Sequence, residues 1–321
     1  MSQKERNISA VDILKARQAL QGVVSRTPLT LSKGLSEASG AEVYVKWENL
    51  QKTGSYKPRG AFYRMNMLTP AERKKGVITI SAGNFALGIA WVADLMGVEA
   101  TIVVPENAAK VKVQQCRSLG AEVLVHGRYF DEANEYCRKL VEKNDRLFVP
   151  PEDDYDVYAG HGTVGYEILE DLPDVETILI PVGGGGLATG VSCWAKTVNP
   201  KIRIIGVQST AAHTLHECFK ARRMVDVQVP PTICEGLAGG ITQLMLDLAL
   251  KYFDDIVLAE EDMLKSAILW TLKNERQLLE GSAVVGPAAI LQGKIKFRKG
   301  EKVAVVATGG NIDVEILGLS A

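Results

Sequence analysis

Short apolar runs rich in β-branched residues alternate along the chain with longer stretches whose apolar residues recur at helical spacing. The runs that predict buried strands span residues 42–47, 77–81, 100–104, 122–125, 177–181, 202–207 and 302–307. The stretches that predict helices span residues 84–96, 109–119, 131–143, 162–172, 187–198 and 261–279. Strands joined through helices of this length are typical of right-handed crossovers in parallel sheets, so the sequence predicts an α/β fold.

The same pattern divides the chain into two domains. Residues 76–148 hold three strand–helix units and end at Val-Pro-Pro-Glu-Asp-Asp, after which the pattern restarts. We therefore expect a small domain of residues 76–148, inserted into a larger domain of residues 1–75 and 149–321. Ligands of open α/β sheets bind at the carboxyl ends of the strands, so the segments that follow the strands carry the functional interpretation.

Composition and charge exclude some classes of function. The chain has 321 residues, a net charge of −1 and a pI of about 6.5, which give no overall attraction to nucleic acid or to an anionic membrane. No apolar run reaches the roughly 18 residues that span a bilayer, and the polar start MSQKERNISA lacks the apolar core of a signal peptide. These features predict a cytoplasmic protein. Five cysteines without a C-x-x-C pair predict reduced thiols, and four scattered histidines predict no metal site.

Lys57 lies in the stretch ENLQKTGSYKPRGAF, residues 48–62. The stretch raises the question whether this lysine is a solvated surface charge, as most lysines are, or a nucleophile. For the neighbouring Lys52 and Arg59 we favour the first role and expect a solvated basic patch.

Two strand ends combine small polar residues with glycine. In ITISAGNFALG a predicted strand runs into SAGN, residues 81–84, at the start of a helix, where backbone N–H groups favour an anion such as a carboxylate. Ordinary helix capping by Ser or Asn explains the same residues. In VAVVATGGNIDVEIL a predicted strand ends at Thr308 and two glycines follow, for which a tight turn is the alternative explanation.

A third strand end, ILIPVGGGGLATG, holds four consecutive glycines between a strand and a helix. Glycine costs conformational entropy on folding, so a run of four needs a reason. A backbone nest that closes around a phosphate at the helix N-terminus supplies one, and a flexible turn is the alternative. The run matches neither the G-x-x-x-x-G-K-[ST] loop nor the G-x-G-x-x-G dinucleotide fingerprint.

Together these stretches resemble the fold type II pyridoxal-phosphate enzymes, in the group of serine/threonine dehydratases and serine racemases. Four motifs of the group occur in its order, QKTGSYKPRGA, SAGN, GGGGL and ATGGN, with weaker matches at AGHGTVGYEIL and EGLAGGI. The resemblance covers nearly the whole chain. It implies two open, twisted, mostly parallel sheets with flanking helices, as in the tryptophan synthase β-like fold. It also implies a pyridoxal 5'-phosphate cofactor, an amino-acid substrate and a homodimer.

The resemblance also implies roles for individual residues. Lys57 matches the lysine that forms the internal Schiff base, and Asn84 the residue that hydrogen-bonds the ring hydroxyl of the cofactor. Thr308 matches the residue at the pyridine nitrogen, and Glu280 an acidic position near the same end. The residues that match the phosphate cradle are Gly183, Gly184, Gly185, Gly186 and Leu187. The residues that match the loop gripping the substrate carboxylate are Ser81, Ala82, Gly83 and Asn84.

These residue types suit α,β-elimination. An amino acid joined to the cofactor becomes acidic at Cα because the ring accepts electrons, and a neutral Lys57 amine can take that proton. A hydroxyl at Thr308 suits an unprotonated pyridine nitrogen, which favours loss of a β-hydroxyl over transamination. We therefore predict a dehydratase that converts a β-hydroxy amino acid such as L-threonine or L-serine into a 2-oxo acid and ammonia. An acid assists the departure of water, and the cofactor phosphate is a candidate for it.

Some positions depart from the pattern of the group. Ala82 stands where the racemases have a serine that acts as a base, so the dehydratase interpretation gains over racemisation. Phe85 and Leu87 replace a histidine and a glutamine, and they are either core packing or a pocket for a less polar substituent. Some members bind a divalent cation after the strand at 202–207, but the corresponding positions lack the carboxylates and predict no cation there: Gln208, Ala212 and Thr214.

Three alternatives remain open. A β-replacement enzyme usually carries an aspartate after the lysine, where this chain has Pro58. A serine racemase is weakened by Ala82, and a non-catalytic pyridoxal-phosphate-binding protein is weakened by the intact set of cofactor-binding residues. We expect no regulatory domain after Ala321 of the kind found in biosynthetic threonine dehydratases, which favours a catabolic or specialised role. The β-hydroxy amino acid itself stays open, with serine and threonine as defaults.

Overall fold

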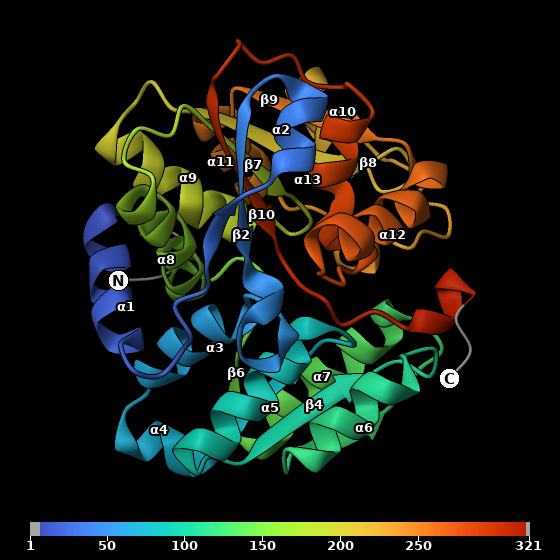
Figure 1. The fold of residues 1–321 in the computed structure, drawn as a ribbon. Helices are drawn as coiled ribbons and strands as arrows, with labels where there is room; N and C mark the ends of the chain where they lie inside the picture. The colour runs from blue at the N-terminus through green and yellow to red at the C-terminus, as the bar shows by residue number, and fades with distance from the viewer. Residues whose placement is uncertain (1–6, 319–321) are drawn as a thin grey trace.

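The structure, a computed structural model that describes residues 7–318, contains two sheets with helices packed around them (Figure 1). The larger sheet has the strand order β1-β2-β10-β7-β8-β9. Neighbouring strands are parallel except for β1, which runs antiparallel to β2. The strands of this sheet are β1 (Leu29–Leu31), β2 (Glu42–Trp47), β7 (Thr177–Pro181), β8 (Arg203–Ser209), β9 (Asp255–Ala259) and β10 (Lys302–Ala307).

The smaller sheet is inserted in the chain between β2 and β7. It has the strand order β5-β4-β3-β6, and all of its neighbours are parallel. Its strands are β3 (Val77–Ile80), β4 (Ala100–Val104), β5 (Glu122–Val125) and β6 (Leu147–Phe148). The predicted α/β class, with two mostly parallel sheets and a small unit inserted in a large one, is confirmed. The domain boundaries at residues 75/76 and 148/149 stay a prediction.

Helices flank both sheets (Figure 1). The helices that accompany the larger sheet along the chain are α1 (Ala10–Leu20), α2 (Lys33–Ser39), α8 (Tyr155–Asp171), α9 (Gly186–Val198), α10 (Thr214–Ala221), α11 (Gln243–Tyr252), α12 (Leu264–Glu275) and α13 (Gly281–Leu291). The chain from β2 to β6 contributes α3 (Lys57–Asn66), α4 (Pro70–Lys75), α5 (Asn84–Met96), α6 (Lys110–Ser118) and α7 (Phe130–Asn144). Within residues 7–318 none of the helices is both long enough and apolar enough to cross a bilayer.

Most predicted elements have the observed bounds to within two residues, but two helices differ. The helix predicted at 162–172 begins at Tyr155, because the Asp154 carboxylate caps it by accepting hydrogen bonds from the N–H groups of Asp156 and Val157 at 2.9 and 3.0 Å. Glycines in the first turns of α8 concealed this start in the sequence. The helix predicted at 261–279 is shorter: α12 ends at Glu275, and the next residue adopts the left-handed conformation with φ of 61°.

Helices α3, α8 and α9 pack so closely that their contacts require glycine. A Cβ at Gly160 of α8 would overlap the carbonyl oxygen of Arg59 in α3. A Cβ at Gly190 of α9 would overlap the carbonyl oxygen of Tyr158 in α8. Helix α8 therefore lies directly against both α3, which begins with Lys57, and α9, which begins in the glycine run.

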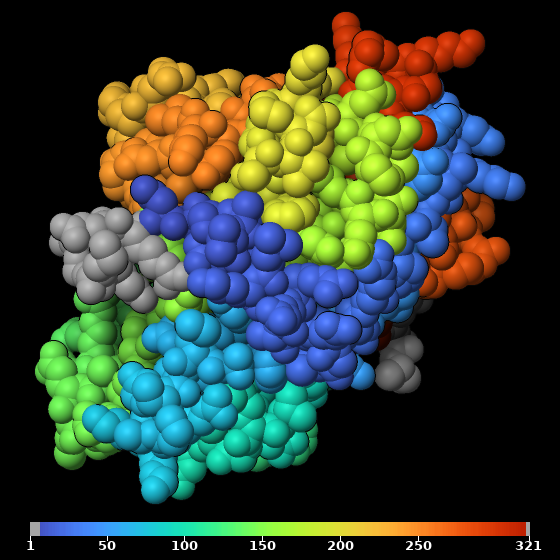
Figure 2. Space-filling view, turned by 90° about the vertical axis from the view of Figure 1, so that its left-hand side faces the viewer, coloured from blue at the N-terminus to red at the C-terminus, as the bar shows by residue number. Residues whose placement is uncertain are grey.

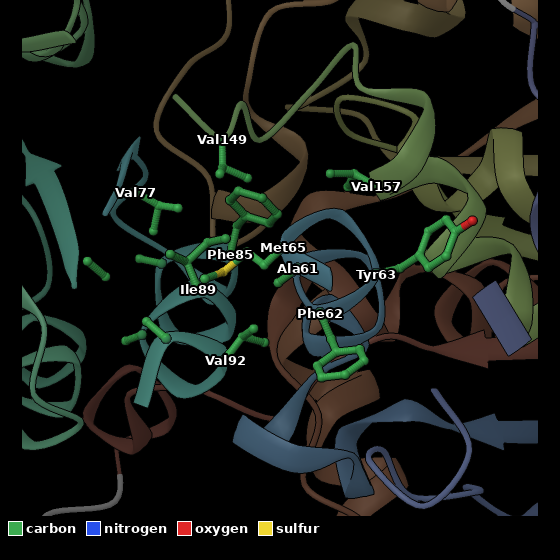
Figure 3. Close-up of a cluster of buried hydrophobic side chains, with 14 of the residues drawn as sticks. Ala61, Phe62, Tyr63, Met65, Val77, Phe85, Ile89, Val92, Val149 and Val157 are labelled. Atoms are coloured by element: carbon green, nitrogen blue, oxygen red, sulfur yellow. The ribbon is translucent and has the colours of Figure 1, made fainter. Parts of the chain in front are cut away.

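A buried apolar cluster joins α3 to α5 (Figure 3). Phe85 of α5 is 2% exposed and lies in this cluster with Met65, Ile89 and Val149. Leu87 is also buried. Both apolar replacements noted in the sequence thus pack in the core. On the outside, the N-terminal segment lies between the two units of the molecule, as its dark blue surface in Figure 2 shows.

Replacing Gly190 by alanine should destabilise the protein, because the added methyl group overlaps backbone that cannot rotate away. We expect a loss of about 1–3 kcal/mol in the free energy of unfolding, the usual cost of overpacking, measured by urea denaturation. Gly240→Ala is the control, since no atom lies within 4 Å of a Cβ there and its φ is not in the left-handed range. Equal stability of the two variants would contradict the close packing of α8 against α9.

Candidate active site

Lys57 is the first residue of α3, and the segment before it is fastened to the end of β10. The Tyr56 N–H donates to the Thr308 carbonyl at 3.1 Å, and Ser55 forms an isolated antiparallel bridge with Gly309. Pro58 at the second helical position is favourable, because the first turn of a helix has no internal acceptor for its N–H. The predicted lysine and the predicted pyridine-end residue are thereby adjacent.

The Lys57 amine lies between two aromatic rings. Its Nζ is 5.0 Å from the ring centroid of Tyr56 and 5.6 Å from that of Phe85. Helix α5 approaches the lysine closely, since a Cβ at Gly88 would lie 3.3 Å from the Lys57 carbonyl carbon. Phe85 thus serves the core and also borders the lysine.

A polar cluster connects the start of α5 with the start of α13. The Asn84 amide donates to Glu280 Oε1 at 2.6 Å and accepts from the Asn311 amide at 2.9 Å. Asn311 also donates to the Thr53 carbonyl at 2.7 Å, which links the cluster to the lysine segment. Burial raises the pKa of Glu280 to about 7, against the opposing effects of Lys112 and of the hydrogen bond from Asn84. Both predicted residues, Asn84 and Glu280, therefore lie at one site.

The glycine run Gly183–Gly186 connects β7 to α9 and is partly exposed. Its neighbours leave no space for side chains: a Cβ at Gly185, whose φ is 81°, would overlap the Met245 sulfur, and one at Gly186 would lie 2.7 Å from the Tyr158 ring. The first-turn N–H groups of α9 have no acceptor earlier in the helix. The run therefore presents backbone rather than side chains at a helix N-terminus, a geometry that suits the predicted phosphate cradle.

The loop 81–84 is half-buried at the start of α5. The N-cap of α5 is Gly83, and no side chain caps the helix. The Ser81 hydroxyl accepts instead from the Gly83 N–H at 3.3 Å. The interpretation of Ser81 and Asn84 as ordinary capping residues is therefore wrong, and the N-terminal N–H groups of α5 remain suited to an anion such as a carboxylate.

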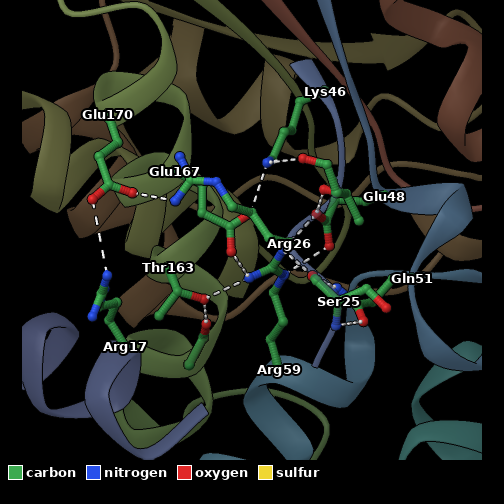
Figure 4. Close-up of polar contacts among 12 residues, drawn as sticks. Arg17, Ser25, Arg26, Lys46, Glu48, Gln51, Arg59, Thr163, Glu167 and Glu170 are labelled. Atoms are coloured by element: carbon green, nitrogen blue, oxygen red, sulfur yellow. Dashed lines mark hydrogen bonds and ion pairs between the residues drawn. The ribbon is translucent and has the colours of Figure 1, made fainter. Parts of the chain in front are cut away.

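The expected solvated basic patch is wrong for Arg59, which is 0% exposed (Figure 4). Its guanidinium donates two hydrogen bonds to Glu48, each at 2.8 Å, and two to Glu167 at 2.7 and 2.9 Å. Lys46 donates to Glu167 at 2.6 Å. Burial alone would lower the pKa of Arg59, but the carboxylates of Glu48 and Glu167 raise it above its usual range. Lys52 is exposed, as expected.

Sequence reasoning missed three further groups around the site. The buried His161 ring lies 4.7 Å from the Tyr56 ring, and burial together with the Lys57 charge lowers the pKa of His161 well below its usual value. Glu152 lies against Gly184, where a Cβ would overlap its carboxylate. Lys112 of α6 pairs with Glu235 at 3.1 Å. Each is distant from Lys57 in sequence, so only the fold brings it to the site. His161 lies in the weaker match AGHGTVGYEIL, which is the one sequence signal that could have indicated it.

The positions assigned to a cation site hold no carboxylate. Gln208 is engaged in the fold, since its amide donates to the Val182 carbonyl and its oxygen accepts from the His216 N–H, both at 2.9 Å. In the part of the chain that the structure describes, no group of three or more His, Cys, Asp and Glu residues is arranged to hold a metal ion. The five cysteines are buried and free, in agreement with the reading as reduced thiols.

The site unites groups that fit a phosphate-bearing aldehyde and an amino acid. The cradle of glycine N–H groups, which side chains would fill, suits a phosphate. Two contacts link this cradle to the neighbourhood of Lys57. His161 Nδ1 lies 3.4 Å from a Cβ position on Gly186, and the His161 ring lies 4.7 Å from the ring of Tyr56, the residue before Lys57. The donors at the start of α5 suit a carboxylate. The residues present therefore fit pyridoxal phosphate.

Comparison with known proteins gives concordant matches. A family model described as "Pyridoxal-phosphate dependent enzyme" matches residues 20–309. An L-threonine ammonia-lyase of Thermotoga maritima is 44% identical over 97% of this chain and 77% of its own length. A catabolic L-threonine dehydratase of Escherichia coli is 37% identical over 94% of this chain and 93% of its own length. The solved structure of maize serine racemase has a TM-score of 0.93 and 28% identity, covering 98% of this chain and 96% of that one.

Removing the Arg59 guanidinium should strongly destabilise the protein. Arg59→Ala leaves the buried Glu48 and Glu167 without their counter-charge, and we expect the free energy of unfolding to fall by about 3–5 kcal/mol. Urea denaturation measures the change. The control is Arg26→Ala, because Arg26 pairs with Glu170 and Asp171 at the surface and its loss should cost at most about 1 kcal/mol. Similar losses in both variants would contradict the central role of the buried network.

The pKa of Glu280 predicts a pH dependence of stability in the cofactor-free protein. Its folded value of about 7 exceeds the ordinary value of 4.5, so the folded state binds the proton more tightly than the unfolded state. The resulting stabilisation is fully present below about pH 4.5 and is lost as the pH rises to about 7, by at most about 1.4 kcal/mol per pH unit.

Denaturation between pH 5 and 8 tests this effect of Glu280. We expect Glu280→Gln to flatten the profile and the exposed Glu106→Gln to retain it. A profile unchanged in Glu280→Gln would show that another group causes the dependence.

Proposed function

We propose that this chain, which belongs to the family of pyridoxal-phosphate dependent enzymes, is an ammonia-lyase that converts a β-hydroxy amino acid such as L-threonine or L-serine into a 2-oxo acid and ammonia. The observation that carries the proposal is the similarity, along nearly the whole chain, to a relative named L-threonine ammonia-lyase. The convergence of the lysine, the asparagine, the glycine cradle and Thr308 on one site supports it.

Lys57 performs two tasks in this proposal. Its amine would hold the cofactor, and in its neutral form it removes the proton from Cα of the substrate. When bound, pyridoxal phosphate supplies an electron sink for the pair left at Cα. The rings of Tyr56 and Phe85 border the amine, and the close approach of α5 at Gly88 positions the Lys57 backbone.

The other residues orient the two ligands. The glycine cradle with Leu187 holds the cofactor phosphate at the N-terminus of α9, and the loop 81–84 holds the substrate carboxylate at the N-terminus of α5. Asn84 hydrogen-bonds the ring hydroxyl. The Thr308 hydroxyl and the Glu280 carboxyl would face the pyridine end of the bound cofactor, where a hydroxyl suits an unprotonated nitrogen and therefore favours β-elimination.

Racemisation is the second candidate function, because a solved serine racemase shares the fold along the whole chain. A racemase needs a proton-carrying group on the face of Cα opposite the lysine. The loop that borders this face carries Ala82, whose methyl group cannot move a proton. Elimination is thus favoured.

β-Replacement is disfavoured by Pro58, and a homodimer in the cytoplasm remains an expectation from the family resemblance.

Replacing Lys57 should abolish both cofactor attachment and activity. In wild-type protein we expect a visible absorbance band near ~410–420 nm after addition of pyridoxal phosphate, and a reducible adduct on Lys57 found by mass spectrometry. Wild-type protein should release 2-oxo acid from L-threonine or L-serine, whereas Lys57→Ala should show neither adduct nor product. The matched control Lys52→Ala removes an exposed lysine of the same segment and should retain both. Product formation by Lys57→Ala would refute the proposal.

A further inference from the structure

Three consecutive acidic residues, Glu152, Asp153 and Asp154, lie between β6 and α8, and only two of them have structural partners. Asp154 caps α8 and accepts from Arg64 Nε at 2.8 Å. Asp153 accepts from the hydroxyl groups of Thr242 at 2.9 Å and Tyr158 at 3.2 Å. Among residues 7–318, none donates a hydrogen bond to the Glu152 carboxylate. Glu152 therefore has no visible task in holding the fold.

The Glu152 carboxyl is directed into the candidate active site. It fills the space that a Cβ at Gly184 would need, and it lies 3.6 Å from a Cβ position on Gly239. Burial raises the pKa of Glu152, the Lys57 charge opposes this effect, and Asp153 adds to it. Glu152 is thus a carboxyl group that borders the glycine cradle, and burial favours its protonated form despite the nearby Lys57 charge.

The elimination proposed above needs such a group. Hydroxide is a poor leaving group at neutral pH, so the β-oxygen requires a proton as the Cβ–O bond breaks. Lys57 takes a proton from Cα in the same process and is not free to donate one at that moment. A carboxyl group at the glycine cradle whose protonated form is favoured by burial is chemically matched to this need.

We infer that Glu152 is the general acid that protonates the departing β-hydroxyl, an assignment that rests on the proposed ammonia-lyase function. The Cα–H bond breaks, and its proton passes to Lys57 Nζ. The Cβ–O bond breaks with its electron pair on oxygen, and the Glu152 proton joins this oxygen to form water. Glu152 is left as a carboxylate and Lys57 as an ammonium, so one proton must return from the lysine to Glu152 through solvent before the next turnover. The substrate has lost one water, and no oxidant or reductant is required.

Two substrates with different leaving groups distinguish a role of Glu152 as general acid from a purely structural role. L-Serine loses hydroxide and needs a proton, whereas β-chloro-L-alanine loses chloride and needs none. We expect Glu152→Gln, which keeps the shape but holds no transferable proton, to lower kcat for L-serine about 10²-fold and to change kcat for β-chloro-L-alanine less than threefold. Glu152→Asp should recover part of the activity on L-serine. The matched control is Glu142→Gln on the exposed face of α7, which should retain both activities.

Cofactor binding provides a readout that does not depend on turnover. Titration of the cofactor-free protein with pyridoxal phosphate should give a Kd for Glu152→Gln within about threefold of the wild-type value. Loss of cofactor binding, or an equal fall of kcat for both substrates, would overturn the assignment, because Glu152 would then hold the cofactor or the fold. Unchanged turnover of L-serine by Glu152→Gln would overturn it as well.

The same experiment distinguishes failure of the inference from failure of the proposed function. If wild-type protein releases 2-oxo acid from L-serine or L-threonine and Glu152→Gln does so equally well, only the assignment of Glu152 fails. If wild-type protein acts on β-chloro-L-alanine but on neither hydroxy amino acid, the proposed function fails, and the assignment of an acid for the hydroxyl is overturned with it.

Discussion

The buried ion pairs of the Arg59 guanidinium are the interaction on which the position of Lys57 depends. Arg59 follows Lys57 by two residues in the first turn of α3, and its four hydrogen bonds to Glu48 and Glu167 bind that turn to the end of β2 and to α8. A planar guanidinium with five N–H donors binds both carboxylates through two hydrogen bonds each, which the three donors of a lysine ammonium cannot do. The network is costly to desolvate, but once formed it fixes the direction in which α3 leaves the larger sheet.

Close helix packing extends this constraint to the rest of the site. Because α8 contacts α3 at Gly160 and α9 at Gly190, the first turns of α3 and α9 are held at a fixed separation. The first carries Lys57, and the second carries the phosphate cradle. The smaller sheet then adds its own strand end, the loop 81–84, through the packing of α5 on α3. The site is thus assembled from the carboxyl ends of strands in both sheets, as expected for open α/β folds.

Much of this arrangement follows from local sequence signals. Strands such as β4 and β10 are apolar runs bounded by polar residues, and the glycine run marks the cradle because four glycines have no other economical explanation. The failures share one cause, which is that tertiary contacts leave little trace in local sequence. Arg59 resembles any solvated arginine until Glu48 and Glu167, 11 before and 108 after it, are brought beside it. Glu152 resembles a loop acid, and only the fold shows that its two acidic neighbours have partners and that it does not.

The pKa values of three groups near Lys57 shift in opposite directions, and burial is the main cause of each shift. Burial raises the pKa values of Glu152 and Glu280 and lowers that of His161, so in each case it favours the neutral form. In their neutral forms Glu152 and Glu280 repel an anion at the glycine cradle or at the N-terminus of α5 less than two carboxylates would. Burial thus favours the protonated form of two carboxyl groups at the site, Glu152 and Glu280. Their places differ, since Glu280 is bound to Asn84 while Glu152 lies at the cradle without a partner among the described residues. Of the two, Glu152 is therefore the carboxyl that we infer to act as the acid.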